Sequence, residues 1–154
     1  VETTAPFGYE LDSTPIPFTI EFAQETQVQL TAQNIIIPGA VELLKVDTNN
    51  PDRVLAGAVF KLLDAQGSLL QDKLVTNSEG KIFVDELVPG EYQFVETKAP
   101  SRYRLDRTPV DFEIVLGQTE TLEVTKTNRR YFPGPPVNPE IPEVPEISET
   151  PETP

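Results

Sequence analysis

The chain reads KIFVDELVPGEYQFVET over residues 81–97. Two runs rich in aliphatic, β-branched and aromatic residues, 81–87 and 91–97, flank Pro89-Gly90, a dipeptide that favours a turn. No long window has the 3.6-residue apolar period of a helix. Further runs of the strand type lie at 41–47, 58–64, 69–76, 110–116 and 120–128, separated by turn signals such as Asn49-Asn50-Pro51-Asp52. About seven short strands at this spacing predict an all-β fold, an antiparallel β-sandwich.

The beginning of the chain repeats part of this pattern. Residues 1–12 align with residues 95–106 at a fixed offset of 94 positions, and the match continues without a gap to Asn34, which meets Asn128. By our count about 15 of about 34 aligned positions are identical, far more than unrelated segments give. We therefore expect tandem modules: residues 1–37 are the C-terminal part of a preceding, truncated module, and residues 38–132 form a complete one.

Residues 133–154 differ in character. They contain half of the 16 prolines, and glutamates recur at every third position from Glu140 to Glu152. Polyproline II has three residues per turn, so like charges would line one edge and extend the chain. The sequence predicts a stiff Pro/Glu-rich spacer, with a proline-motif ligand as the alternative.

Composition excludes several function classes. The 154 residues include no Cys and no His, and 25 acidic residues against 12 basic ones give a net charge of −13. A thiol nucleophile, an imidazole base and an ordinary zinc site are therefore excluded, and we expect no metal and no cofactor. The charge disfavours nucleic acid and anionic lipid as partners, and no apolar stretch is long enough to span a membrane.

Three predicted strands place a polar residue on their inward face. Strand alternation puts Lys45 in line with Val41 and Leu43, Glu96 in line with Tyr92 and Phe94, and Asn128 in line with Leu122 and Val124. In the earlier copy, Glu2 and Asn34 occupy the positions of Glu96 and Asn128. An unpaired buried charge is expensive, so these groups need a physical explanation.

Two explanations stay open from the pattern alone. In the first, Lys45, Glu96 and Asn128 form a satisfied polar network with an ion pair. In the second, burial lowers the pKa of Lys45 until its neutral amine attacks the side-chain carbonyl of Asn128. Glu96 would polarise that carbonyl and shuttle protons, ammonia would leave, and an intramolecular amide would join the first strand to the last.

The module resembles a known family in four stretches: VELLKVD at 41–47, LAGAVFKL at 55–62, LVPGEYQFVETKAP at 87–100 and YRLD at 103–106. It closely resembles the B-type repeats of Gram-positive collagen adhesins and the SpaA-type pilin domains, whose fold is a prealbumin-like, immunoglobulin-like sandwich. Many members form a Lys–Asn isopeptide bond assisted by a glutamate. By position, the resemblance implies Lys45 and Asn128 as the crosslinked pair and Glu96 as the catalytic residue.

Two positions depart from the pattern. Arg102 stands where the family usually has glycine, as Gly8 does in the earlier copy, so we expect the loop after Pro100 to differ in shape. Lys126 shares the inward parity of Asn128, and since Ala32 is its counterpart we expect a rim lysine with a solvated head. The lysine partner of Asn34 would lie upstream of Val1, so no crosslink is expected at Asn34.

The function expected from this resemblance is structural. We expect a stalk module of a secreted, wall-attached bacterial adhesin or pilin, stabilised by its own crosslink and not an enzyme in the ordinary sense. Expected partners are neighbouring modules of the same chain and, through other parts of the protein, the peptidoglycan cell wall. The alternatives are an adhesin domain that binds a host matrix protein or glycan, and an accessory sandwich beside a polysaccharide-processing enzyme.

Overall fold

All strands in the described part of the chain lie within residues 39–128. The computed structural model describes residues 1–132, and the spacer predicted for 133–154 lies outside the described residues. The strands are β1 (Gly39–Asp47), β2 (Asn50–Val54), β3 (Val59–Asp64), β4 (Leu69–Val75), β5 (Lys81–Leu87), β6 (Gly90–Lys98), β7 (Val110–Ile114) and β8 (Leu122–Asn128).

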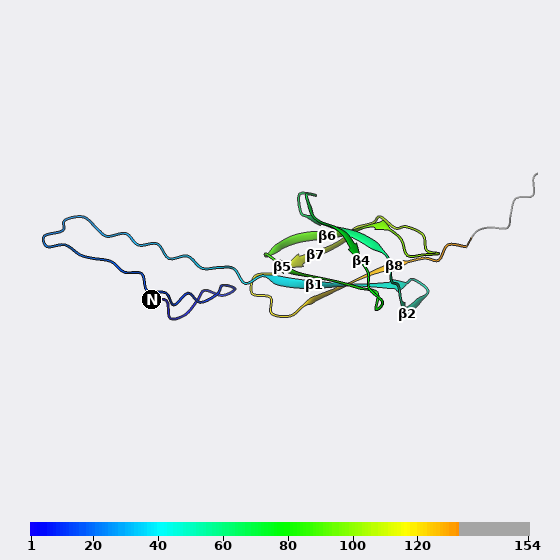
Figure 1. Cartoon of the computed structure of the whole chain (residues 1–154), viewed down its shortest axis with the longest axis horizontal. Helices are drawn as coiled ribbons and strands as arrows, with labels where there is room; N and C mark the ends of the chain where they lie inside the picture. The colour runs from blue at the N-terminus through cyan, green and yellow to red at the C-terminus, as the bar shows by residue number, and fades with distance from the viewer. Residues whose placement is uncertain (133–154) are drawn as a thin grey trace, which may run out of the picture.

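Two sheets face each other (Figure 1). In one, β1 pairs with β5 and β2 along one edge and with β8 along the other, and the second sheet has the order β4-β3-β6-β7. All pairs are antiparallel except β1 with β8, which run parallel from Val41 opposite Leu122 to Asp47 opposite Asn128. The predicted all-β sandwich is confirmed, and its first and last strands are direct neighbours.

Alternating apolar residues fill the space between the sheets. Phe94 is fully buried, its ring stacks on that of Phe112 with a centroid distance of 5.1 Å, and it meets Phe60 edge-on at 6.4 Å. Val41 and Leu43 of β1 are fully buried against this group. Aromatic pairs of this kind add about 0.5–1.5 kcal/mol each beyond the area they bury. The core therefore holds β1 and β6 at fixed positions on opposite sides.

The segment 49–52 corrects the prediction. A turn was expected there, but β2 begins at Asn50 and makes only two registered pairs with β1, Asp47 with Asn50 and Val46 with Val54. Pro51 is compatible with this strand because β2 lies at the edge of its sheet, where a missing N–H breaks no ladder. The turn is thus tighter than predicted, at Thr48-Asn49.

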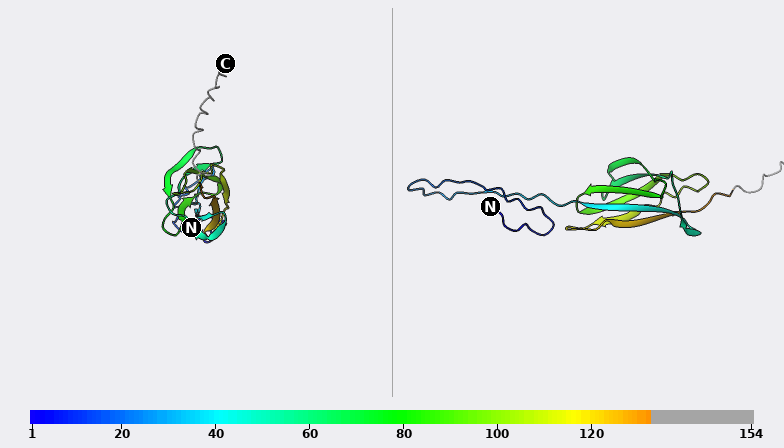
Figure 2. Two further views of the ribbon diagram at one scale, coloured as in Figure 1. Left: turned by 90° about the vertical axis from the view of Figure 1, so that its right-hand side faces the viewer. Right: turned by 60° about the horizontal axis from the view of Figure 1, so that its bottom comes forward.

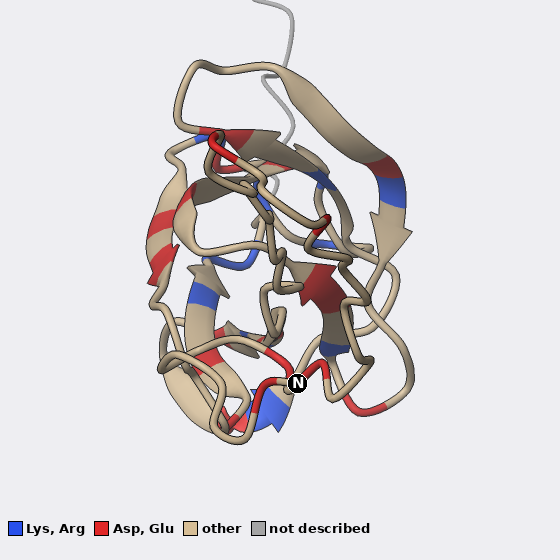
Figure 3. Cartoon of the chain, turned by 90° about the vertical axis from the view of Figure 1, so that its left-hand side faces the viewer, with Lys and Arg blue, Asp and Glu red and all other residues tan. Residues whose placement is uncertain are grey.

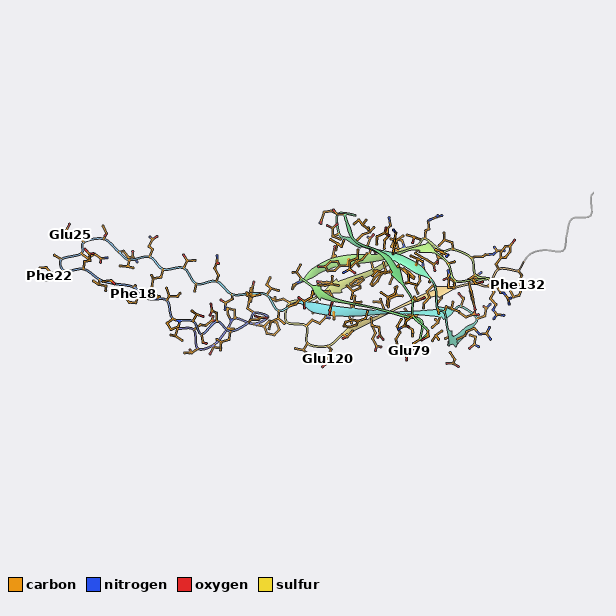
Figure 4. All side chains as sticks on the ribbon, in the orientation of Figure 1. Phe18, Phe22, Glu25, Glu79, Glu120 and Phe132 are labelled. Carbon is orange, nitrogen blue, oxygen red and sulfur yellow. The ribbon has the colours of Figure 1, made fainter. Side chains whose placement is uncertain are left out.

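Residues 1–37 lie beyond one end of the sandwich as a long, extended loop (Figures 1 and 2). They contain a single bridge, between Tyr9 and Ile36, and no strand. Many of their apolar side chains are exposed, including Phe18 and Phe22 near the tip (Figure 4).

The loop after Pro100 also corrects an expectation. Tyr103 N donates to Pro100 O at 3.1 Å, and Tyr9 N donates to Pro6 O at the same distance. Arg102 has a φ of +69° and Gly8 one of +81°. The two loops therefore share one turn, and the expected difference in shape was wrong. Arg102 adopts the left-handed conformation at a cost of about 1–2 kcal/mol.

Candidate functional site

The three predicted residues meet in the core. Lys45 of β1 and Glu96 of β6 have no exposed surface, and Asn128 of β8 is 2% exposed. β1 and β8 are neighbours in one sheet, and β6 belongs to the other, so the carboxylate faces the lysine and the asparagine across the interior. The predicted burial of all three is confirmed.

The carboxylate of Glu96 lies between the other two groups. Its Oε1 is 3.7 Å from Lys45 Nζ, and its Oε2 accepts a hydrogen bond from Asn128 Nδ2 at 2.9 Å. Asn128 Nδ2 also donates to the backbone carbonyl of Arg104 at 2.7 Å. Each carboxylate oxygen therefore faces one of the two nitrogens that an amide exchange would involve.

The loop between β6 and β7 closes the site from one side. The backbone N–H of Asp106 donates to Glu96 Oε2 at 2.9 Å. The carboxylate of Asp106 pairs with Lys126 Nζ at 2.8 Å, and the same ammonium donates to Thr108 O at 2.7 Å. The ion pair between Lys126 and Asp106 thus holds the β6–β7 loop in place, and the N–H of Asp106 in that loop positions the carboxylate of Glu96.

Lys126 is buried, contrary to expectation. Its side chain is only 7% exposed, whereas a solvated head was predicted. The reason is the loop, since Asp106 and Thr108 reach over β8 and supply the oxygen partners that water would otherwise provide. The strand pattern contains no information about this loop.

The environment of Lys45 favours its neutral form. Burial lowers the pKa of Lys45 to about 8, the Glu96 carboxylate opposes this shift, and the nearby Lys126 charge adds to it. Its amine makes one long hydrogen bond, 3.3 Å to the carbonyl of Lys126. The hydrogen bond from Lys126 lowers the pKa of Asp106 to about 2. A nucleophilic amine is therefore accessible near neutral pH.

Two buried oxygens lack partners. Within residues 1–132, Glu96 Oε1 and Asn128 Oδ1 are buried side-chain atoms without a hydrogen bond. Buried polar atoms are usually satisfied, so an orphaned pair in one cluster marks a strained or reactive site. Glu96 Oε1 still lies within ion-pair distance of Lys45 Nζ, at 3.7 Å, so both sequence explanations stay open.

Residues 1–37 contain a second copy of the hydrogen bonds around the carboxylate. Asn34 Nδ2 donates to Glu2 Oε2 at 2.8 Å and to Glu10 O at 3.0 Å, and Asp12 N donates to Glu2 Oε2 at 3.0 Å. Each partner lies 94 positions before its equivalent in the complete module. Here Glu2 and Asn34 are only half-buried, and residues 1–37 contain no lysine.

Sequence reasoning missed part of the site. It did not single out Asp106, whose N–H and carboxylate join Glu96 to Lys126, or Asp47, which accepts a hydrogen bond from Tyr103 Oη at 2.9 Å. A signal existed for Asp106 and Tyr103, because both are identical in the two copies, as Asp12 and Tyr9. No cluster of three or more potential metal ligands occurs among residues 1–132.

Charged positions of both signs occur at the end of the molecule where residues 1–37 lie. Acidic and basic positions are found there on strands and loops alike (Figure 3). The net charge of the chain, −13, disfavours a polyanion as a partner. Residues 1–132 contain no helix of the length and apolarity that crossing a bilayer requires.

The sandwich is similar to domains of known proteins. The model of a family described as SpaA, prealbumin-like fold domain, matches residues 39–130. Among solved structures, BcpA, the major pilin subunit of Bacillus cereus, is similar at 34% identity and a TM-score of 0.54, over 59% of this chain and 28% of that one. The Bacillus anthracis TIE protein is similar at 28% identity and a TM-score of 0.64, over 82% of this chain and 24% of that one.

A third similar structure is GBS52, the minor pilin of Streptococcus agalactiae, at 27% identity and a TM-score of 0.55. The match covers 69% of this chain and 50% of that one. The chain thus spans half or less of each of these three proteins. No curated protein matches the chain.

Proposed function

Since the chain belongs to the SpaA family of prealbumin-like fold domains, we propose that it is a structural stalk module of a bacterial surface protein, a pilin or an adhesin, which crosslinks itself by a Lys45–Asn128 isopeptide bond. Similarity to pilin subunits supports the structural role. The observation that supports the crosslink most is the buried cluster of Lys45, Glu96 and Asn128, in which the lysine pKa is lowered to about 8.

The proposed reaction begins with a proton transfer. Lys45 Nζ gives a proton to Glu96 Oε1, 3.7 Å away, and the neutral pair that results no longer carries charge into the core. The amine then attacks Asn128 Cγ. The negative charge develops on the carbonyl oxygen Oδ1, which has no hydrogen-bond donor within residues 1–132, so the proton now on Glu96 would have to stabilise it. Desolvation makes this attack easier, because a buried amine has no water shell to lose.

Glu96 completes the exchange on its other oxygen. Its Oε2 already faces Asn128 Nδ2 at 2.9 Å, so the carboxyl group can deliver a proton to that nitrogen and take one from Nζ. The Cγ–Nδ2 bond breaks, ammonia leaves, and a Cγ–Nζ amide remains. The atoms balance without a cofactor, and the reaction occurs once per chain, so the module is no enzyme in the ordinary sense.

The bond would stabilise the fold through its position. It would join neighbouring strands that stand first and last in the module and close a loop of about 80 residues. By the chain-entropy argument for disulfides, such a closure stabilises the folded state by about 4–5 kcal/mol. A stalk exposed to proteases and to pulling requires stability of this kind.

The proposal includes a tandem arrangement. The recurrence of the Glu2–Asn34 hydrogen bonds 94 positions before those of Glu96 and Asn128 supports residues 1–37 as part of a preceding module and 38–132 as a complete one. Residues 133–154 would act as a spacer. The neighbouring modules are the proposed partners, and the location is extracellular, with attachment to the cell wall through other parts of a longer protein.

Intact mass spectrometry tests the crosslink. The parent chain should be lighter than its sequence mass by one ammonia, and a Glu96→Gln variant should have the full mass because the proton relay is lost. Glu91→Gln, an exposed position on the same strand, is the matched control and should retain the deficit. Peptide mapping should recover Lys45 joined to Asn128.

The opposite results have definite meanings. Full mass in the parent chain would reduce the cluster to a buried polar network and remove the crosslink from the proposed function. A deficit that maps to Lys126 in place of Lys45 would contradict the assignment of the nucleophile.

A further inference from the structure

Two glycine turns touch where residues 1–37 meet the sandwich. Gly8 lies in the turn after Pro6, and Gly117 lies in the turn between β7 and β8. A Cβ atom added to Gly8 would lie 2.5 Å from Leu116 Cγ, and one added to Gly117 would lie 2.4 Å from the ring of Phe7. Real Cβ contacts are not this short, so a side chain at either glycine would require Leu116 or Phe7 to move.

The connecting segment binds both turns. Ile37 N donates to Gly8 O at 2.9 Å, and Gln118 Nε2 donates to Ala40 O at 2.9 Å. Gly39 is also tightly packed, since a Cβ there would lie 2.6 Å from Ile114. The turn of the preceding segment, the connection and the turn of the sandwich are therefore held to one another on both sides of Pro38.

The repeat shows that the backbone conformation does not itself demand glycine. Gly8 and Gly117 have φ values of +81° and +74°, but their equivalents 94 positions away, Arg102 and Ala23, have φ values of +69° and +61°. Both equivalents are exposed. In both pairs of equivalent positions, the positive φ is thus tolerated without glycine. In each pair, the glycine is the member that has another turn packed against it.

The equivalent turn at the other end of the sandwich has different residues. Ser101 and Arg102 replace Phe7 and Gly8, while Arg130 and Tyr131 replace Ile36 and Ile37. Arg130 Nε lies 3.6 Å from Asp47 Oδ2, and the Arg104 guanidinium lies 5.8 Å from the centre of the Tyr131 ring. The arginines of this end therefore contact residues of the same end, Asp47 and Tyr131. A terminal repeat has a polar outer face of this kind.

We propose that the Phe7–Gly8 and Leu116–Gly117 turns form a fixed joint between two modules of the same repeat, and that the Ser101–Arg102 turn does not accept a further module in this arrangement. The proposal rests on the tandem organisation proposed above. An arginine at the turn would place its side chain where the neighbouring Leu116 lies, and a serine lacks the ring that covers the opposing glycine.

Distance measurements between two spin labels test the joint. The chain has no cysteine, so Gln33→Cys and Glu79→Cys, both exposed, give one label on each side. The parent should give a single narrow distance distribution. Gly8→Arg, which copies Arg102 into the joint, should broaden it about twofold or more, because the added Cβ meets Leu116. Gly67→Arg is the matched control, since Gly67 has a φ of +78° and open space around it.

A second variant covers the other side of the joint. Gly117→Ala copies Ala23 and should broaden the distribution as well, because its methyl group meets Phe7. A broad distribution in the parent, a narrow one in Gly8→Arg, or equal broadening in Gly67→Arg would each overturn the proposal. Intact mass of the same samples reports on the crosslink separately, so failure of the joint is distinguishable from failure of the proposed function.

Discussion

The pKa of Lys45 links burial to reactivity. An amine whose pKa is lowered to about 8 is mostly charged at pH 6 and mostly neutral above pH 8. The reactive pair, a neutral amine beside a protonated Glu96, holds as many protons as the ion pair, so the crosslinking rate should be flat below pH 8 and fall about tenfold per pH unit above it. A photocaged lysine at position 45, released by light in the folded chain, allows the rate to be followed by mass at each pH. A rate that rises about tenfold per pH unit between pH 6 and 8 would show that the amine loses its proton to solvent and not to Glu96.

Lys126 affects the same rate through its charge. Replacing it with alanine, the residue at its counterpart Ala32, removes a like charge near Lys45, so the pKa of Lys45 should rise and the pH profile should move to higher pH. Lys98→Ala, at an exposed position, should leave the profile unchanged. An unshifted profile in Lys126→Ala would mean that the charge of Lys126 does not lower the pKa of Lys45.

The same variant has a stability effect. Hydrogen bonds from Lys126 and, second, from the backbone N–H of Thr108 lower the pKa of Asp106 from 3.8 to about 2. The stabilisation from the Lys126–Asp106 ion pair is therefore present above pH 3.8 and is lost as the pH falls toward 2. Asp106 is about half exposed but Lys126 is buried, so the loss in Lys126→Ala at pH 7 should be about 1.5–3 kcal/mol in urea unfolding. The difference from the parent should shrink at pH 2, where Asp106 of the parent is about half protonated.

At the scale of the strand, alternation explains what the sequence could predict. The period of two was sufficient to place Lys45, Glu96 and Asn128 inside, because a strand that buries one face fixes every second residue. It could not place Asp106, which lies in a loop without a period, or identify the parallel pairing of β1 with β8. Partner choice and loop closure depend on contacts that are distant in sequence. β2 was missed because only two of its residues are paired with β1.

The parallel neighbours β1 and β8 determine how force passes through the module. Pulling on the ends loads β1 at Gly39 and β8 at Asn128, so a Lys45–Asn128 bond transfers the force across the sheet and shields residues 46–127. A crosslinked module should not extend in single-molecule pulling. Asn128→Ala, which cannot crosslink, should release roughly 290 Å, the extended length of the shielded segment. An extension of that size in the parent would contradict a completed bond.

The chain has two glutamate–asparagine networks, Glu96–Asn128 and Glu2–Asn34, but we expect only the first to react. The hydrogen-bond partners of Asn34 are the equivalents, 94 positions earlier, of the partners of Asn128. Residues 1–37 contain no lysine to face Glu2. If a buried amine drives the exchange, the chain should lose one ammonia and not two, and peptide mapping should recover Asn34 with its amide intact. If the glutamate alone activated the asparagine, both sites would react with water or with any nearby amine. Loss of ammonia at Asn34 would therefore refute the role assigned to Lys45, and an intact Asn34 beside a converted Asn128 would separate the contribution of the lysine from that of the carboxylate within one chain.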